Sequence, residues 1–174
     1  MILPPAPTIE GYGRILAEGT PTARANLRGS TRYPGISGTV LFYPSGPGVL
    51  VAAQVAGLPT QTGQCRSGVF GFHIHEGGSC TGTAADPFAN TGMHFSPVKC
   101  PHPHHAGDLP PLFENRGRAF LVVFTDRFTI PQIIGRTVVI HSQPDDFTTQ
   151  PAGNSGVKIA CGPIRSLRRI PSRV

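Results

Sequence analysis

Histidine is the residue type in this sequence whose placement most clearly indicates chemistry. All seven histidines lie in the stretch from His73 to His141, and the rest of the 174 residues contains none. They are His73, His75, His94, His102, His104, His105 and His141. Imidazole is the commonest protein ligand for zinc and copper, so this clustering predicts a metal centre. The number of imidazoles favours a centre with more than one ion.

The pair His73 and His75 lies at the end of an apolar run that is typical of a β-strand. Alternate residues of a strand face the same side, so both imidazoles should share one face, with Cα atoms about 6.6–7 Å apart. Phe72 and Ile74 would then face the core. This spacing suits chelation of one ion, although a polar strand face that carries two histidines would show the same pattern.

Three further places supply imidazoles that could join this pair. His141 ends the apolar run 137–141, and His94 lies in a segment without periodicity. The run His102-Pro103-His104-His105-Ala106-Gly107-Asp108 contains three imidazoles and a carboxylate, which suit four-coordinate zinc. The alternative for this run is a surface tract that binds metal loosely.

The elements that must position these side chains are short strands joined by long loops. The 22 glycines and 19 prolines favour turns and strands over helices. Apolar runs predict strands at 23–29, 36–42, 48–56, 68–75, 118–125, 136–141 and 157–161. Only 130–134 has weak helical periodicity. The segments 76–113 and 142–156 are predicted loops, and loops of this length usually have a function or a covalent or metal tie. We therefore predict an all-β fold, an immunoglobulin-like sandwich or Greek-key barrel with two large functional loops.

The length predicts one domain, with boundaries drawn by composition. Residues 1–21, which include Pro4, Pro5 and Pro7, are interpreted as an extension, 22–165 as the core domain and 166–174 as a basic tail. No apolar stretch is long enough to span a membrane. The first residues lack the charged region and apolar core of a signal peptide, so we expect an intracellular protein or an exported one whose signal was removed.

Arginine dominates the net charge of +6, since Lys99 and Lys158 are the only lysines. The tail contains Arg168, Arg169 and Arg173, but it is short and has no interleaved aromatic residues. Nucleic-acid binding is therefore not expected, and a solvated tail is the simpler interpretation. A positively charged channel could instead attract small anions.

The four cysteines are Cys65, Cys80, Cys100 and Cys161. None forms a CxxC motif, which argues against a thiolate zinc ribbon and against a redox dithiol. An even number allows two disulfides with three pairings, and buried free thiols are the alternative.

Taken with their neighbours, these residues closely resemble the copper–zinc superoxide dismutase family. The matching segments occur in the family's order and with similar spacing across most of the chain, from about 23 to 164. They are Gly71-Phe72-His73-Ile74-His75-Glu76, Gly92-Met93-His94-Phe95-Ser96-Pro97, His105-Ala106-Gly107-Asp108-Leu109-Pro110, Ile134-Gly135-Arg136-Thr137-Val138-Val139-Ile140-His141 and Gly153-Asn154-Ser155-Gly156-Val157-Lys158-Ile159-Ala160-Cys161-Gly162.

The resemblance implies a role for each ligand position. Copper would be held by His73, His75, His94 and His141. Zinc would be held by His94, His102, His105 and Asp108, with the His94 imidazolate bridging the two ions. His104 competes with His102 for the third position, and the spacing from His94 and His105 favours His102.

The resemblance also implies roles around the ligands. Asp145 corresponds to the family's aspartate that accepts hydrogen bonds from ligands of both ions, although it could also be a loop aspartate that caps a turn. Cys80 and Cys161 correspond to the family's disulfide, and parity then leaves a second bridge between Cys65 and Cys100. Lys158 stands where the family usually has an arginine that guides superoxide. Lysine lacks the planar fork of arginine, so we expect activity with a lower rate or a changed salt dependence.

The implied activity is the disproportionation of superoxide to dioxygen and hydrogen peroxide, with copper and zinc as cofactors. The implied partners are superoxide, a second copy of the chain and a copper chaperone. Two alternatives remain: a zinc-loaded, copper-poor metal-binding protein without dismutase activity, and a structural or interaction module.

Overall fold

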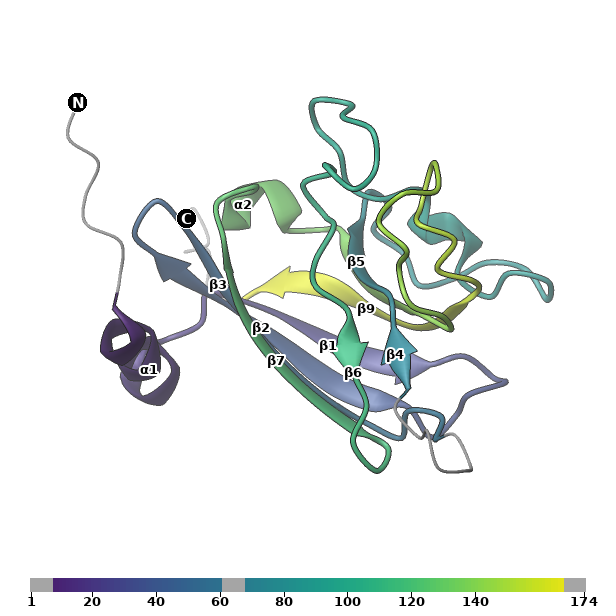
Figure 1. The fold of residues 1–174 in the computed structure, drawn as a ribbon, viewed down its shortest axis with the longest axis horizontal. Helices are drawn as coiled ribbons and strands as arrows, with labels where there is room; N and C mark the ends of the chain where they lie inside the picture. Colours follow the sequence, from purple (N-terminus) through teal and green to yellow (C-terminus); the bar gives the residue numbers. More distant parts are fainter. Residues whose placement is uncertain (1–7, 61–67, 168–174) are drawn as a thin grey trace, which may run out of the picture.

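The computed structural model describes residues 8–60 and 68–167, and strands dominate it (Figure 1). The elements in chain order are α1 (Ile9–Glu18), β1 (Ala23–Gly29), β2 (Ser37–Ser45), β3 (Gly48–Ala56), β4 (Val69–Phe70), β5 (Phe72–His75), η1 (Ala89–Thr91), β6 (Leu112–Phe113), β7 (Arg118–Thr125), α2 (Ile130–Ile133), β8 (Thr137–His141) and β9 (Lys158–Ser166).

Seven strands form one antiparallel sheet in the order β5-β8-β9-β1-β2-β3-β7, and β4 pairs with β6 in a second, two-stranded sheet. The large sheet curls into a half-barrel around an apolar core (Figure 1). This architecture confirms the all-β prediction.

Period-two alternation explains which residues fill that core. In β1, Ala23, Ala25 and Leu27 are buried, whereas Arg24 and Arg28 point outward. The predicted strands at 23–29, 48–56 and 118–125 have the observed bounds. The run predicted as one strand at 68–75 is interrupted at Gly71, which places β4 and β5 in different sheets. The last predicted strand continues past 161 to Ser166, because β9 pairs with β1 along this length.

The helix α1 was not predicted, because the prolines before it favoured an irregular extension. Thr8 caps the helix, since its Oγ1 accepts a hydrogen bond from the Gly11 amide at 3.1 Å. The ring of Tyr12 lies 5.6 Å from that of Phe124 on β7, so the helix contacts the sheet. No helix among the described residues is long and apolar enough to cross a membrane.

The two long loops predicted from the sequence lie close together. Figure 1 shows them beside β5, on the side of the barrel away from α1. The first contains η1 and β6, and the second connects β8 to β9. The histidines of β5 and β8 therefore lie next to the loops that supply the remaining side chains.

Candidate metal centre

Two groups of four buried side chains could each hold a metal ion. In each group, one possible ligand atom per residue lies within 4.8 Å of all the others. The first group is His73, His75, His94 and His141, and the second is His94, His102, His105 and Asp108. His94 belongs to both groups, so the two possible sites are adjacent.

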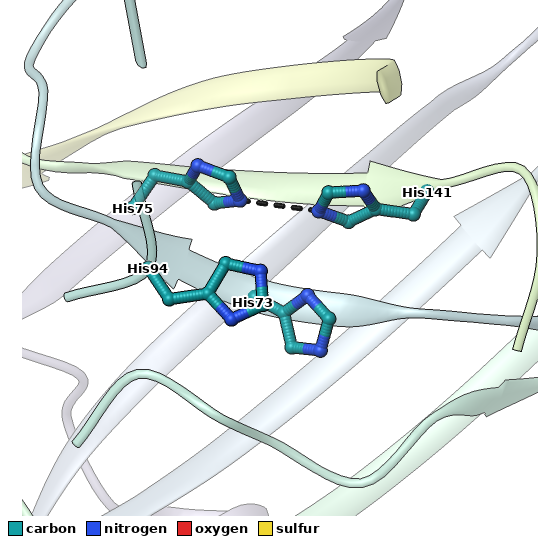
Figure 2. Close-up of side chains that lie close together, drawn as sticks. All are labelled: His73, His75, His94 and His141. Atoms are coloured by element: carbon teal, nitrogen blue, oxygen red, sulfur yellow. Dashed lines mark hydrogen bonds between the residues drawn. The ribbon is translucent and has the colours of Figure 1, made fainter. Parts of the chain in front are cut away.

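Strands position most of the first group (Figure 2). His73 and His75 come from β5, His141 ends the neighbouring strand β8, and His94 lies opposite His75 in an isolated β-bridge. The Nε2 atoms of His75 and His141 are 3.1 Å apart. The Nδ1 atom of His75 lies 2.9 Å from the Gly92 carbonyl oxygen. A carbonyl oxygen only accepts hydrogen bonds, so this contact places the proton on Nδ1. The lone pair of Nε2 then faces His141, and this arrangement suits a cation.

Burial keeps the imidazoles of His73, His75 and His141 neutral. It lowers the pKa of His73, it lowers the pKa of His75 well below the ordinary value, and it lowers the pKa of His141 to about 3. Neighbouring imidazoles lower these pKa values further. Neutral imidazole is the form that binds metals, so the group is prepared for coordination at neutral pH.

In the second group, three imidazoles converge on one carboxylate. The Nδ1 atom of His94 lies 2.8 Å from Asp108 Oδ1, and the Nδ1 atoms of His102 and His105 lie 3.0 and 3.2 Å from Asp108 Oδ2. Burial acts to raise the pKa of Asp108, but the hydrogen bond from His94 and the surrounding imidazoles outweigh it and lower the pKa. Three imidazoles and an ionised carboxylate match the usual donor set of four-coordinate zinc.

Three buried ring nitrogens in the two groups make no hydrogen bond: His73 Nδ1, His94 Nε2 and His102 Nδ1. The last of these is close to the Asp108 carboxylate, but the contact is not a hydrogen bond. Buried polar atoms without partners are rare and costly in folded proteins. Only one other buried side-chain atom of the described residues, Ser45 Oγ, lacks a partner. The concentration of such atoms here fits nitrogens that are reserved for metal ions.

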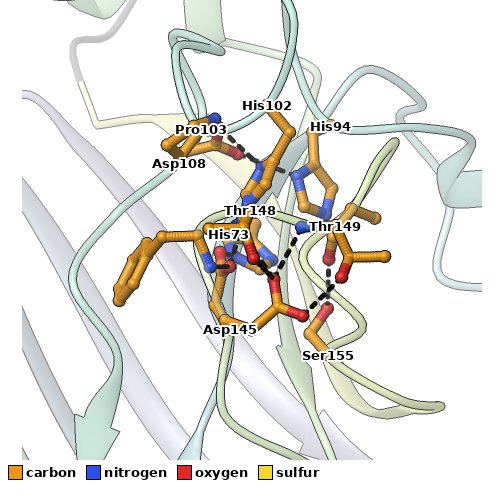
Figure 3. Close-up of polar contacts among 12 residues, drawn as sticks. His73, His94, His102, Pro103, Asp108, Asp145, Thr148, Thr149 and Ser155 are labelled. Atoms are coloured by element: carbon orange, nitrogen blue, oxygen red, sulfur yellow. Dashed lines mark hydrogen bonds and ion pairs between the residues drawn. The ribbon is translucent and has the colours of Figure 1, made fainter.

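Asp145 connects the two groups (Figure 3). Its two carboxylate oxygens lie 2.8 Å from His73 Nε2 and 2.8 Å from His102 Nε2. The amide of Phe147 also donates to Asp145 Oδ1, at 2.7 Å. Burial acts to raise the pKa of Asp145, but the hydrogen bonds from His73, Phe147 and His102 lower it well below the ordinary value. The ionised carboxylate fixes protons on both Nε2 atoms and leaves the Nδ1 lone pair of each ring free to bind a cation.

Close packing of Gly153 completes this arrangement. Its φ is +65°, and a Cβ atom there would lie 1.9 Å from Asp145 Oδ1 and 2.7 Å from His102 Nε2. Only glycine fits this position, and the loop between β8 and β9 can therefore close over the carboxylate. Sequence reasoning did not identify this function of Gly153, because the contact depends on the loop's path.

The structure distinguishes the two candidate histidines of the 102–105 run. His102 is 3% exposed and belongs to the second group, whereas His104 is exposed and belongs to neither. His102 therefore lies in the second group, as its spacing from His94 and His105 predicted.

One of the two predicted disulfides is confirmed. Cys80 and Cys161 form a disulfide, which ties the first long loop to β9. The second predicted bridge, between Cys65 and Cys100, stays a prediction, because Cys65 lies outside the described residues. Within the described part of the chain, Cys100 is a free thiol.

Lys158 lies at the entrance to the first group. It lines a cavity of about 430 Å³ together with His75, His94 and His141. Its Nζ atom lies 3.0 Å from Asp86 Oδ2 and donates to the Phe88 carbonyl oxygen at 3.2 Å. The ion pair with Asp86 was not predicted, because no sequence pattern relates two residues so far apart in the chain.

Comparisons with known proteins agree with this geometry. Residues 36–164 match the family model described as copper/zinc superoxide dismutase. A Cu-Zn superoxide dismutase of Deinococcus radiodurans is 35% identical over 167 residues, which cover 86% of this chain and 87% of that one. A Cu-Zn superoxide dismutase of Aquifex aeolicus is 34% identical over 133 residues, which cover 68% of this chain and 72% of that one. The crystal structure of a double mutant of a superoxide dismutase-like protein from Bacillus subtilis superposes with a TM-score of 0.67 at 30% identity, over 80% of this chain and 95% of that one. The chain belongs to the copper/zinc superoxide dismutase family.

Proposed function

We propose that the protein disproportionates superoxide to dioxygen and hydrogen peroxide at a copper–zinc centre bridged by His94. Copper would be held by the four imidazoles of the first group, and zinc by the three imidazoles and Asp108 of the second. The observation that carries the proposal is the placement of the two ring nitrogens of His94, one in each group. Its Nδ1 lies 2.8 Å from Asp108 in the second group, and its buried Nε2 has no hydrogen-bond partner.

The donor chemistry suits these two ions. Four imidazoles suit copper, and an imidazole–carboxylate set suits zinc. Bound copper would supply the one-electron redox chemistry, since zinc has none of its own.

The residues around the ions would orient ligands and move protons. Nε2 of His94 would accept a proton when it is not bound to metal and would deliver it to the reduced substrate. Asp145 would keep His73 and His102 in the tautomers that point Nδ1 at the ions. Lys158 would attract the superoxide anion at the cavity entrance, with its charge reduced by Asp86.

The four-imidazole group favours this function over a zinc-loaded, copper-poor binding protein, which would need only the second group. An interaction module would need neither group. A homodimer and a copper chaperone stay predictions.

The proposal is tested by His141→Ala, with His104→Ala as a matched control that removes an exposed imidazole outside both groups. Elemental analysis of the unmodified protein should give close to one copper and one zinc per chain, with cyanide-sensitive dismutation. His141→Ala should lose copper and at least about 99% of the activity, since it removes a ligand, yet keep zinc. His104→Ala should keep both metals and the activity. Dismutation retained by His141→Ala, or no activity in the copper-reconstituted unmodified protein, would overturn the proposal.

A further inference from the structure

Acidic residues are distributed very unevenly along this chain. No aspartate or glutamate occurs between Glu18 and Glu76, and none follows Asp146. These two acid-free segments contain nine of the 15 basic residues: Arg24, Arg28, Arg32, Arg66, Lys158, Arg165, Arg168, Arg169 and Arg173. The metal centre and its loops contain most of the carboxylates.

The sheet brings the two acid-free segments together. β9 pairs with β1, β1 with β2, and β2 with β3, so four adjacent strands have no carboxylate. On the outward side of these strands, Arg24 and Arg165 are directly opposite each other, and Arg28 lies farther along β1. We call the outward side of β9, β1, β2 and β3 the basic face.

No carboxylate of the described residues neutralises the arginines of the basic face. Arg24, Arg28 and Arg165 are exposed, and none of them forms an ion pair with a described residue. Like charges directly opposite each other in a sheet are destabilising. An anion bound between Arg24 and Arg165 would remove this repulsion.

The basic face is hollowed over β1, β2 and β3. Polar and apolar side chains line a cavity of about 920 Å³ there, and Arg24 and Arg28 are among them. Between these arginines, a row of neutral hydrogen-bonding side chains crosses three strands in register: Asn26, Thr39 and Gln54. The lining contains no aromatic side chain, so it lacks the stacking platform on which single-stranded nucleic acids bind. It also lacks the large exposed apolar side chains that anchor proteins to a membrane surface.

We propose that the basic face binds an acidic polysaccharide, a sugar polymer with sulfate or carboxylate groups. Guanidinium groups pair with sulfate or carboxylate through two parallel hydrogen bonds. The amides and the hydroxyl of the central row can both donate to and accept from sugar hydroxyls, whereas guanidinium groups only donate. The face shares no residue with the metal groups, so binding would localise the protein without blocking the centre.

The test uses dextran sulfate and polygalacturonate as probes, neutral dextran as the blank, and the full chain loaded with metal. Arg24→Gln with Arg165→Gln removes two charges from the basic face. Arg168→Gln with Arg169→Gln removes the same charge from the tail. We expect the face variant to bind an acidic polymer about tenfold more weakly, with a salt slope lower by about two, and the tail variant to bind with at most about twofold loss. Both variants should keep the dismutation rate and melting temperature of the unmodified protein.

Several outcomes would overturn the proposal. They are absence of binding to both acidic polymers, equal binding by the face variant, and a loss in the tail variant as large as that in the face variant. Double-stranded DNA that binds as tightly as the acidic polymers, with the same dependence on Arg24 and Arg165, would assign the basic face to nucleic acid instead.

Discussion

At the scale of single residues, three imidazoles of the two groups are fixed through one ring nitrogen, which leaves the other nitrogen free for a cation. Asp145 holds His73 and His102, while the Gly92 carbonyl holds His75. Strand alternation predicted that His73 and His75 share a face, and the resemblance to the family implied which other histidines join them. The sequence could not predict which nitrogen of each ring is free, since this depends on backbone carbonyls such as that of Gly92.

Asp145→Asn should weaken zinc binding about ten- to hundredfold, because the amide no longer provides two anionic acceptors for His73 and His102. Competition with a zinc chelator measures the change. Asp146→Asn is the control, since Asp146 accepts hydrogen bonds only from the exposed turn at Thr148 and Thr149. Equal zinc affinity in the two variants would contradict the assigned function of Asp145.

At the scale of elements, strands were predictable and the geometry of the loops was not. Alternation of buried and exposed residues in β1 is visible in the sequence, and its bounds were predicted correctly. The end of β9 depends on its pairing with β1, a tertiary contact that local composition does not reveal. The conformation of the loop after β8 depends on contacts such as that of Gly153 with Asp145, which no periodic pattern indicates.

The disulfide between Cys80 and Cys161 joins the first long loop covalently to β9. Replacing Cys80 and Cys161 together by serine should lower the free energy of unfolding by about 2–5 kcal/mol, since the bridge closes a loop with a sequence separation of 81 residues. Urea denaturation of the metal-free protein measures this difference. Cys100→Ser, which removes a free thiol, should change stability by less than about 1 kcal/mol. A double variant as stable as the unmodified protein would show that the loops are held without the bridge.

At the scale of the whole molecule, the metal centre makes stability depend on pH. The metal-free fold buries neutral imidazoles, and burial lowers the pKa of His73 and His75 and lowers that of His141 to about 3. The unfolded chain therefore binds more protons than the folded one between the ordinary histidine pKa, about 6.5, and these lowered values.

The free energy of unfolding of the metal-free protein should therefore be highest above about pH 6.5 and should decrease as the pH falls toward 3. Below about pH 4 the loss should continue, because Asp108 and Asp145 also have lowered pKa values and must then be protonated. Urea denaturation at several pH values measures the slope. His141→Ala is the control and should show a shallower slope above pH 4, whereas a slope equal to that of the unmodified protein would contradict the contribution of His141.

The ion pair between Lys158 and Asp86 has a consequence for every anion that enters the cavity beside His141. With a separation of 3.0 Å, Asp86 is a tethered counter-ion that is present at the lysine whether or not substrate is there. An anion that settles on Lys158 must displace this carboxylate or share the ammonium group with it. An anion that stays at the entrance therefore competes with Asp86 for Lys158, whereas one that only passes through the cavity need not break the ion pair.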